Sequence, residues 1–257
     1  MSISDKTLKQ KSLLFAKLAA DAYGKESAVT DAVKEHGLKV KMFYNLGGAQ
    51  AYRLESSTDV IIACRGTQPT EFNDLAADLK AFPVKSETVS RVHRGFKAEV
   101  DELWPSIGRD LVTDKKVWFC GHSLGAAMAT IMASRCADSV TLPNPEQLYT
   151  YGSPRVGWPK YVKSLKVDHI RWKNNNDIVT SVPLRIMNYK HHGKLHYIRS
   201  DGSINSTGVS NWFTRLKDRL RGMLLGLTKG KIDNFSDHAM VGYIEHIEKW
   251  NGFYKKL

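Results

Sequence analysis

A serine lies between two glycines at residues 121–125, in the run Gly-His-Ser-Leu-Gly. The residues before it, 117–120, are apolar, and small or apolar residues follow it. This is the pattern of a nucleophile elbow, in which the serine sits on a sharp strand-to-helix turn with its hydroxyl exposed. A helix that begins there directs its N–H groups and positive dipole end toward the same point, which suits a developing oxyanion. We therefore predict that Ser123 is a nucleophile; the alternative is a coincidental match in which Ser123 only turns the chain.

An acid is expected after the serine, because the chain order in this arrangement is serine, acid, histidine. Asp177 follows a predicted strand and the run Asn174-Asn175-Asn176, where an acid at a strand end belongs. The alternative interpretation of that run is a plain turn. Other acids after the serine have less suitable settings: Asp168, Asp201 and Asp233. Asp177 is therefore the predicted acid.

A histidine base must follow the acid and reach back over the end of the sheet. His238 lies at the start of the last predicted helix, after a long loop, and is the first candidate. His246 falls inside that helix and is expected on its surface, and His196 also follows the serine. His191 and His192 are close to Pro183 in the chain and are expected to support the site without acting as the base.

The elements that would position these residues alternate between strands and helices. Strands are predicted at 39–46, 49–55, 59–67, 116–121, 147–154, 168–174 and 195–200, the first two joined by a hairpin at Gly47-Gly48. Helices are predicted at 70–82, 95–112, 123–137, 160–165 and 237–250. This alternation implies an α/β fold with a mainly parallel central sheet and helices on both faces. In such a sheet reactive groups gather at the carboxyl ends of the strands, where Ser123 and Asp177 fall.

Composition sets the broad class. The chain of 257 residues is 42% hydrophobic and 25% charged, which is typical of a globular protein. Apolar residues at helical spacing, from Leu14 to Ala22, predict an amphipathic first helix ending near Gly24 rather than a signal peptide. We therefore expect a cytoplasmic location, with secretion not excluded. The net charge of +12 suits an anionic partner, but the basic residues are dispersed and no nucleic-acid motif is present.

Several segments in order along the chain resemble the class 3 lipases, the fungal-type lipases of the α/β-hydrolase fold. They are RGTQ (65–68), DLAADL (74–79), VHRGF (92–96), GHSLGAAMA (121–129), YGSPRVG (151–157), NNDIVTSVP (175–183), HG (192–193) and DHAMVGY (237–243). The resemblance covers roughly residues 12–250 and implies a single α/β-hydrolase domain over 1–257. It implies Ser123 as nucleophile, Asp177 as acid and His238 as base.

The resemblance also implies an oxyanion hole. Thr67 matches the family's oxyanion serine or threonine, which donates through its backbone N–H and hydroxyl. The second donor is the backbone N–H of Leu124, the residue after the nucleophile. No metal and no organic cofactor is implied.

The resemblance predicts a serine-dependent carboxylic ester hydrolase, specifically a lipase that acts on acylglycerols or related lipid esters through an acyl-enzyme. Phospholipase or feruloyl-esterase-like activity is the alternative within the same chemistry. A non-catalytic α/β-hydrolase-like binding protein is a further alternative, which the complete set of site residues disfavours.

Residues 204–233 are expected to form a helical excursion. Apolar residues from Val209 to Leu227 fall on one helical face, and Arg215, Lys217, Arg219 and Arg221 occupy the other. The simpler interpretation is a helix packed on the domain with solvated charges. The alternative is a cap or a contact with an anionic membrane or lipid interface through 209–231.

Overall fold

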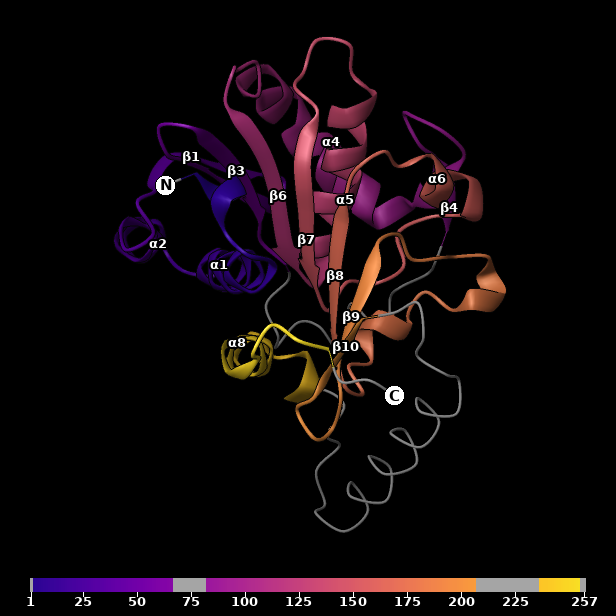
Figure 1. Cartoon of the computed structure of the whole chain (residues 1–257). Helices are drawn as coiled ribbons and strands as arrows, with labels where there is room; N and C mark the ends of the chain where they lie inside the picture. The colour runs from indigo at the N-terminus through magenta and orange to yellow at the C-terminus, as the bar shows by residue number, and fades with distance from the viewer. Residues whose placement is uncertain (1, 67–81, 207–235, 255–257) are drawn as a thin grey trace.

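A computed structural model of the chain describes residues 2–66, 82–206 and 236–254. Its centre is an eight-stranded sheet with the strand order β1-β2-β3-β6-β7-β8-β9-β10 (Figure 1). The strands are β1 Lys39–Leu46, β2 Ala49–Glu55, β3 Asp59–Cys64, β6 Lys116–His122, β7 Pro145–Tyr151, β8 His169–Asn174, β9 Lys194–Ile198 and β10 Ile204–Ser206. The run from β3 to β9 is parallel, and β1, β2 and β10 pair antiparallel. The predicted mainly parallel sheet is confirmed.

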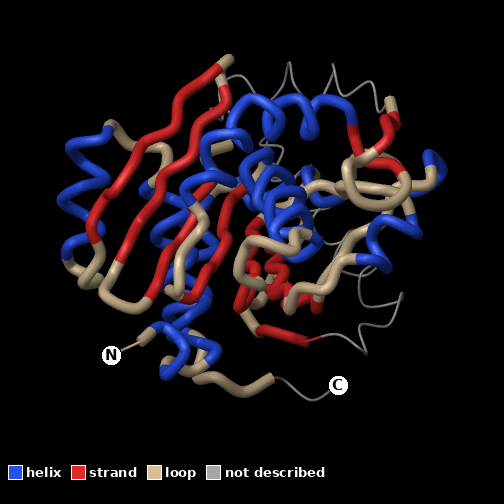
Figure 2. Tube along the Cα trace, turned by 90° about the horizontal axis from the view of Figure 1, so that it is seen from above, coloured by secondary structure: helices blue, strands red, loops and turns tan. Residues whose placement is uncertain are grey.

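Helices cover both faces of this sheet, as Figure 2 shows from above. They are α1 Leu8–Asp21, α2 Glu26–Lys34, α4 Arg94–Asp110, α5 Leu124–Asp138, α6 Pro159–Ser164 and α8 Met240–Lys249. Helices α1, α2 and α8 share one core with Ile61 and Ala63 of β3, while α4, α5 and α6 share the other with Ile62 and Cys64. Alternate residues of one strand thus enter opposite cores, which explains the continuous apolar pattern of β3.

Short elements complete the described chain. A two-stranded hairpin pairs β4 Pro83–Lys85 with β5 Arg91–His93, and 3-10 turns lie at η1 Ile3–Asp5, η2 Val179–Ser181, η3 Arg185–Met187 and η4 Ser236–His238. Helix α2, this hairpin and β10 were not predicted. In α2 only Val29 and Val33 are buried, which is too few to make its periodicity stand out.

Some predicted features lie outside the described residues. These are the oxyanion residue Thr67, nearly all of the helix expected at 70–82, and residues 207–235, which include the basic surface at 209–231. The expectation of a helical excursion beginning at residue 204 is wrong at its start, because 204–206 form β10 beside β9. Their backbone pairs with β9 and forms the edge strand of the sheet, so these residues do not start a helix.

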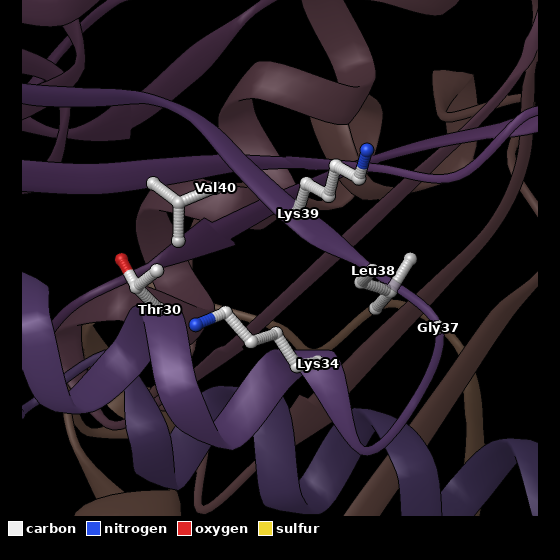
Figure 3. Close-up of a pocket in the computed structure, with 6 residues that line it drawn as sticks. All are labelled: Thr30, Lys34, Gly37, Leu38, Lys39 and Val40. Carbon is white, nitrogen blue, oxygen red and sulfur yellow. The ribbon is translucent and has the colours of Figure 1, made fainter.

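A groove of about 540 Å³ lies between α2 and β1 (Figure 3). Its lining consists of Thr30, Lys34, Gly37, Leu38, Lys39 and Val40. Lys39 pairs with Glu55, and Glu55 pairs with Val60 at the amino end of β3. The groove therefore lies near the amino end of β3, at the opposite end of the sheet from the carboxyl ends of the parallel strands.

Among the residues that the structure describes, no helix is long and apolar enough to cross a membrane.

Candidate active site

Ser123 occupies a strained turn between β6 and α5. Its φ of 57° and ψ of −127° are unusual for a residue with a side chain, and strain of this kind persists only where the surrounding structure imposes it. Its N–H donates to the carbonyl of Tyr151 at 3.1 Å, which ties the turn to the end of β7. Ser123 Oγ is buried and has no hydrogen-bond partner among the residues that the structure describes. The elbow predicted at residues 121–125 is therefore present.

The two glycines of the elbow are required for close packing. A Cβ on Gly125 would collide with the carbonyl of Cys64 in β3, and a Cβ on Gly121 would collide with the backbone of Gly125. Helix α5 can therefore start against β3 and β6 only where both side chains are absent. As the first residue of α5, Leu124 carries one of the N–H groups for which the helix has no acceptor.

His238 and Asp177 form a buried pair beside this turn. His238 Nδ1 lies 3.0 Å from both carboxylate oxygens of Asp177, and the Asp177 side chain is fully buried. A carboxylate only accepts, so Nδ1 carries the proton and Nε2 is the ring nitrogen left to act as a base. The histidine and the acid predicted from the sequence are brought together across 61 residues of chain.

Two further donors hold the carboxylate of Asp177. The Tyr243 hydroxyl donates to Oδ2 at 2.6 Å, and the Val179 N–H donates to Oδ1 at 2.9 Å. Burial and the neighbouring carboxylate raise the pKa of Tyr243 well above its ordinary value, so the phenol stays a donor. Its oxygen also accepts from the N–H of Asn174 at 3.0 Å. These bonds stabilise the charge of the acid and fix its orientation.

The asparagine run before Asp177 connects the acid to the segment that carries the base. Asn174 Nδ2 donates to the carbonyl of Asp237 at 3.0 Å. The carboxylate of Asp237 accepts from Asn175 Nδ2 and from the N–H of Asn176, both at 3.0 Å. The run is therefore more than a plain turn, because it positions the residue immediately before His238.

His122, the residue before the serine, links the elbow to the base. Its ring lies 4.3 Å from the ring of His238, and its Nε2 donates to the carbonyl of His238 at 2.7 Å. Since that carbonyl can only accept, Nδ1 of the neutral ring must accept from the Tyr23 hydroxyl, 2.9 Å away. Burial, and then the nearby His238, lower the pKa of His122 well below its ordinary value. The neutral His122 ring thus connects Tyr23, which follows α1, to the backbone of His238.

The loop after Asp177 is held by two other side chains. His191 Nε2 donates to the carbonyl of Thr180 at 2.9 Å. The buried guanidinium of Arg155 donates to the carbonyls of Ser181 and Pro183. The expectation that His191 supports the site is met by this contact.

The remaining histidines lie elsewhere. His192 Nδ1 is 3.1 Å from His169 Nδ1 at the amino end of β8, opposite Asp177, so the expected supporting role for His192 is wrong. His196 packs against the rings of Trp172 and Tyr254, at 5.0 and 5.7 Å. His246 lies within α8 as predicted, but it is half-buried and not fully on the surface of the helix.

Tyr23, Tyr243 and His122 were not predicted as site residues. Tyr243 carried a detectable signal, because Met240, Tyr243 and Ile247 form the buried face of α8 and a buried phenol needs a hydrogen-bond partner. Nothing in the sequence near Tyr23 indicates its partner, which lies 99 residues away.

Fold and site together define the class of this protein: an α/β-hydrolase with Ser123 after β6, Asp177 after β8 and His238 from η4 beside Asp177. The sequence model described as Lipase (class 3) matches residues 61–187. Over these residues the chain is similar to the class 3 lipases.

This chain is similar to known proteins over only part of their length. The chain is 30% identical over 164 residues to a lipase of Rhizomucor miehei, across 58% of this chain and 44% of that protein. It is 33% identical over 154 residues to the toxin TseL of Vibrio cholerae, across 58% of this chain and 23% of that protein. The chain thus spans less than half the length of either relative. A crystal structure of a mutant MDLA from Penicillium cyclopium has a TM-score of 0.71 at 20% identity and covers 96% of this chain and 99% of that chain, which supports the shared fold.

Proposed function

We propose that the chain is a serine-dependent carboxylic ester hydrolase that acts on acylglycerols or related lipid esters. One observation carries this proposal: the buried His238–Asp177 pair adjoins a strained serine that begins a helix. The similarity to a lipase of Rhizomucor miehei supports lipid esters as the substrate class. We assign Ser123 as nucleophile, His238 as base and Asp177 as acid.

The reaction would proceed in two halves. Ser123 Oγ bonds to the ester carbonyl carbon while its proton passes to Nε2 of His238. Asp177 stabilises the imidazolium, the bond to the alcohol oxygen breaks, and His238 gives its proton to that oxygen. Water then attacks the acyl-enzyme and passes a proton to His238, which returns it to Ser123 Oγ as the carboxylic acid leaves.

The oxyanion formed in each half requires donors. The Leu124 N–H at the start of α5 is one, and Thr67 is assigned as the other from the resemblance to the family. A donor aimed at the oxyanion contributes about 3–4 kcal/mol to transition-state stabilisation.

Hydrolysis of a soluble nitrophenyl ester by the Ser123→Ala, His238→Ala and His246→Ala variants tests the proposal. We expect the first two to lower kcat by about four orders of magnitude or more, because losses of triad members are of this size. His246→Ala is the matched control on α8, the helix that follows His238, and should retain the parent rate. Activity of Ser123→Ala within about tenfold of the parent would overturn the assignment.

Labelling provides an independent check. A phosphonate ester should add covalently to Ser123, and mass spectrometry of the digested protein should locate it there. Labelling at another residue would contradict the proposed nucleophile.

A further inference from the structure

Three large apolar side chains are exposed within four residues of the chain between β8 and β9. Leu184, Ile186 and Met187 are 55%, 90% and 43% exposed, and the short helix η3 brings them together in one turn. Single exposed apolar residues are ordinary on protein surfaces, whereas contiguous ones mark contact sites. We call residues 184–187 the apolar turn.

The apolar turn is held rigidly at both ends. Before it, the Arg155 guanidinium donates to the carbonyl of Pro183 at 2.6 Å. After it, Tyr189 is fully buried, and the Lys190 N–H donates to the carbonyl of Gly157 at 2.9 Å. Because the backbone on either side is fixed, binding through this turn does not require a loop to be ordered first.

The chain on either side of the apolar turn carries charges of one sign. Between Asp177 and Asp201 the chain contains no acidic residue, while it contains four basic ones: Arg185, Lys190, Lys194 and Arg199. Arg185, Lys190 and Lys194 are exposed. An apolar tip flanked by cations is complementary to an anionic lipid surface, where the apolar groups enter the acyl region and the cations meet phosphate headgroups.

The apolar turn is close to the candidate active site in the chain. Leu184 follows Asp177 by seven residues, which span ~25 Å at most when fully extended. In Figure 1 the chain between β8 and β9 runs out to the right-hand side of the molecule. A lipid surface bound by this turn would therefore lie within reach of the site.

We propose that the apolar turn is an insertion element that docks the protein on anionic lipid surfaces. Leu184, Ile186 and Met187 enter the surface, and Arg185, Lys190 and Lys194 contact its headgroups. This gives the proposed lipid-ester hydrolase access to its substrate and so rests on the proposed function for its purpose. Its test does not, because binding is measured without hydrolysis.

The test uses the full chain carrying Ser123→Ala, so that no lipid is consumed. Its binding to phosphatidylcholine vesicles with and without phosphatidylserine is measured by co-sedimentation. We expect Leu184→Ser, Ile186→Ser and Met187→Ser together to lower the partition coefficient by at least about tenfold. Arg185→Gln, Lys190→Gln and Lys194→Gln together should lower binding to phosphatidylserine vesicles at low salt and leave the weaker binding to phosphatidylcholine unchanged.

The matched control changes two exposed valines near the amino ends of two central strands, Val112→Ser and Val140→Ser. They are 68% and 101% exposed and precede β6 and β7, so any general loss of surface hydrophobicity is reproduced away from the turn. The control should bind as the parent does. Equal binding by the parent and the apolar-turn variant would overturn the proposal, as would a loss shared by the control. When Ser123 is restored, the turn variants should hydrolyse a soluble ester at the parent rate. A loss of ester hydrolysis without any change in vesicle binding would count against the proposed function and not against the docking proposal.

Discussion

Gly152 follows β7 and lies against the buried His238–Asp177 pair. A Cβ at this position would be 2.8 Å from Asp177 Oδ2 and from Cε1 and Nδ1 of His238. Ordinary van der Waals contact begins near 3.4 Å, so Gly152→Ala requires the imidazole and the carboxylate to retreat by about 0.6 Å. The backbone is also left-handed, with φ of +59°, which costs an alanine ~1–2 kcal/mol.

The displacement should appear in the chemical step. A misplacement of about 1 Å lowers a rate by ~10²-fold, so we expect Gly152→Ala to lower kcat between about 10-fold and 100-fold. The KM for a small soluble ester should change little, because no group that binds the substrate is removed. Steady-state hydrolysis of a nitrophenyl ester measures both constants, and urea unfolding measures the accompanying loss of stability.

Gly48→Ala separates backbone strain from the contact with the pair. Gly48 also has a positive φ, +91°, but no atom lies within 4 Å of the Cβ position. Both variants should lose unfolding free energy, and only Gly152→Ala should lose activity. If Gly152→Ala kept the kcat of Gly48→Ala, the inference that this glycine sets the position of the pair would be refuted.

Two other predictions concern buried groups. Tyr243→Phe removes the 2.6 Å hydrogen bond to Asp177 and the acceptor for the Asn174 N–H. We therefore expect kcat to fall about tenfold and the unfolding free energy to fall by ~1–3 kcal/mol. Steady-state kinetics and urea unfolding measure these changes, and an unchanged kcat would contradict the prediction. Burial lowers the pKa of His93 to about 4, from about 6.5 when unfolded. The unfolded state therefore binds more protons between those values, and stability from this group is complete above pH 6.5, falls as the pH drops toward 4, and is constant below. His93→Asn keeps a capping side chain at the start of α4 but removes the titrating ring. Between pH 6.5 and 4, its unfolding free energy in urea should therefore fall by up to ~3 kcal/mol less than that of the parent. Parallel curves of unfolding free energy against pH for the two proteins would refute the assignment to His93.

Much of the fold could be predicted because its strands are buried in distinct ways. The run at 59–64 is apolar throughout since both faces of β3 pack against helices, and the hairpin at Gly47-Gly48 has glycines where both φ values are positive. Helix α2 escaped prediction because only two of its nine residues are buried. Strand β10 escaped because its three residues are ordered by pairing with β9, which is not visible in a local window.

The candidate site divides in the same way. The position of Ser123 could be predicted because the elbow depends on residues within the same short run, including the glycines that allow α5 to approach β3. The acid and base required chain order and family resemblance as well. What could not be predicted is which group each supporting residue contacts, because Tyr23, Gly152 and Tyr243 act through neighbours far away in the chain.

This division follows from what each residue has to do. A nucleophile needs an unusual backbone, and an unusual backbone leaves a local trace such as the glycines on either side of Ser123. A supporting tyrosine needs only a buried hydroxyl aimed at a partner, and its own backbone stays ordinary. Tyr243 therefore resembles any core residue of α8 until the helix is seen to lie over Asp177. The orientation of a base by remote hydroxyls and carbonyls is a property of the packed fold, which is why substitutions at these positions test the site as directly as substitutions of the triad.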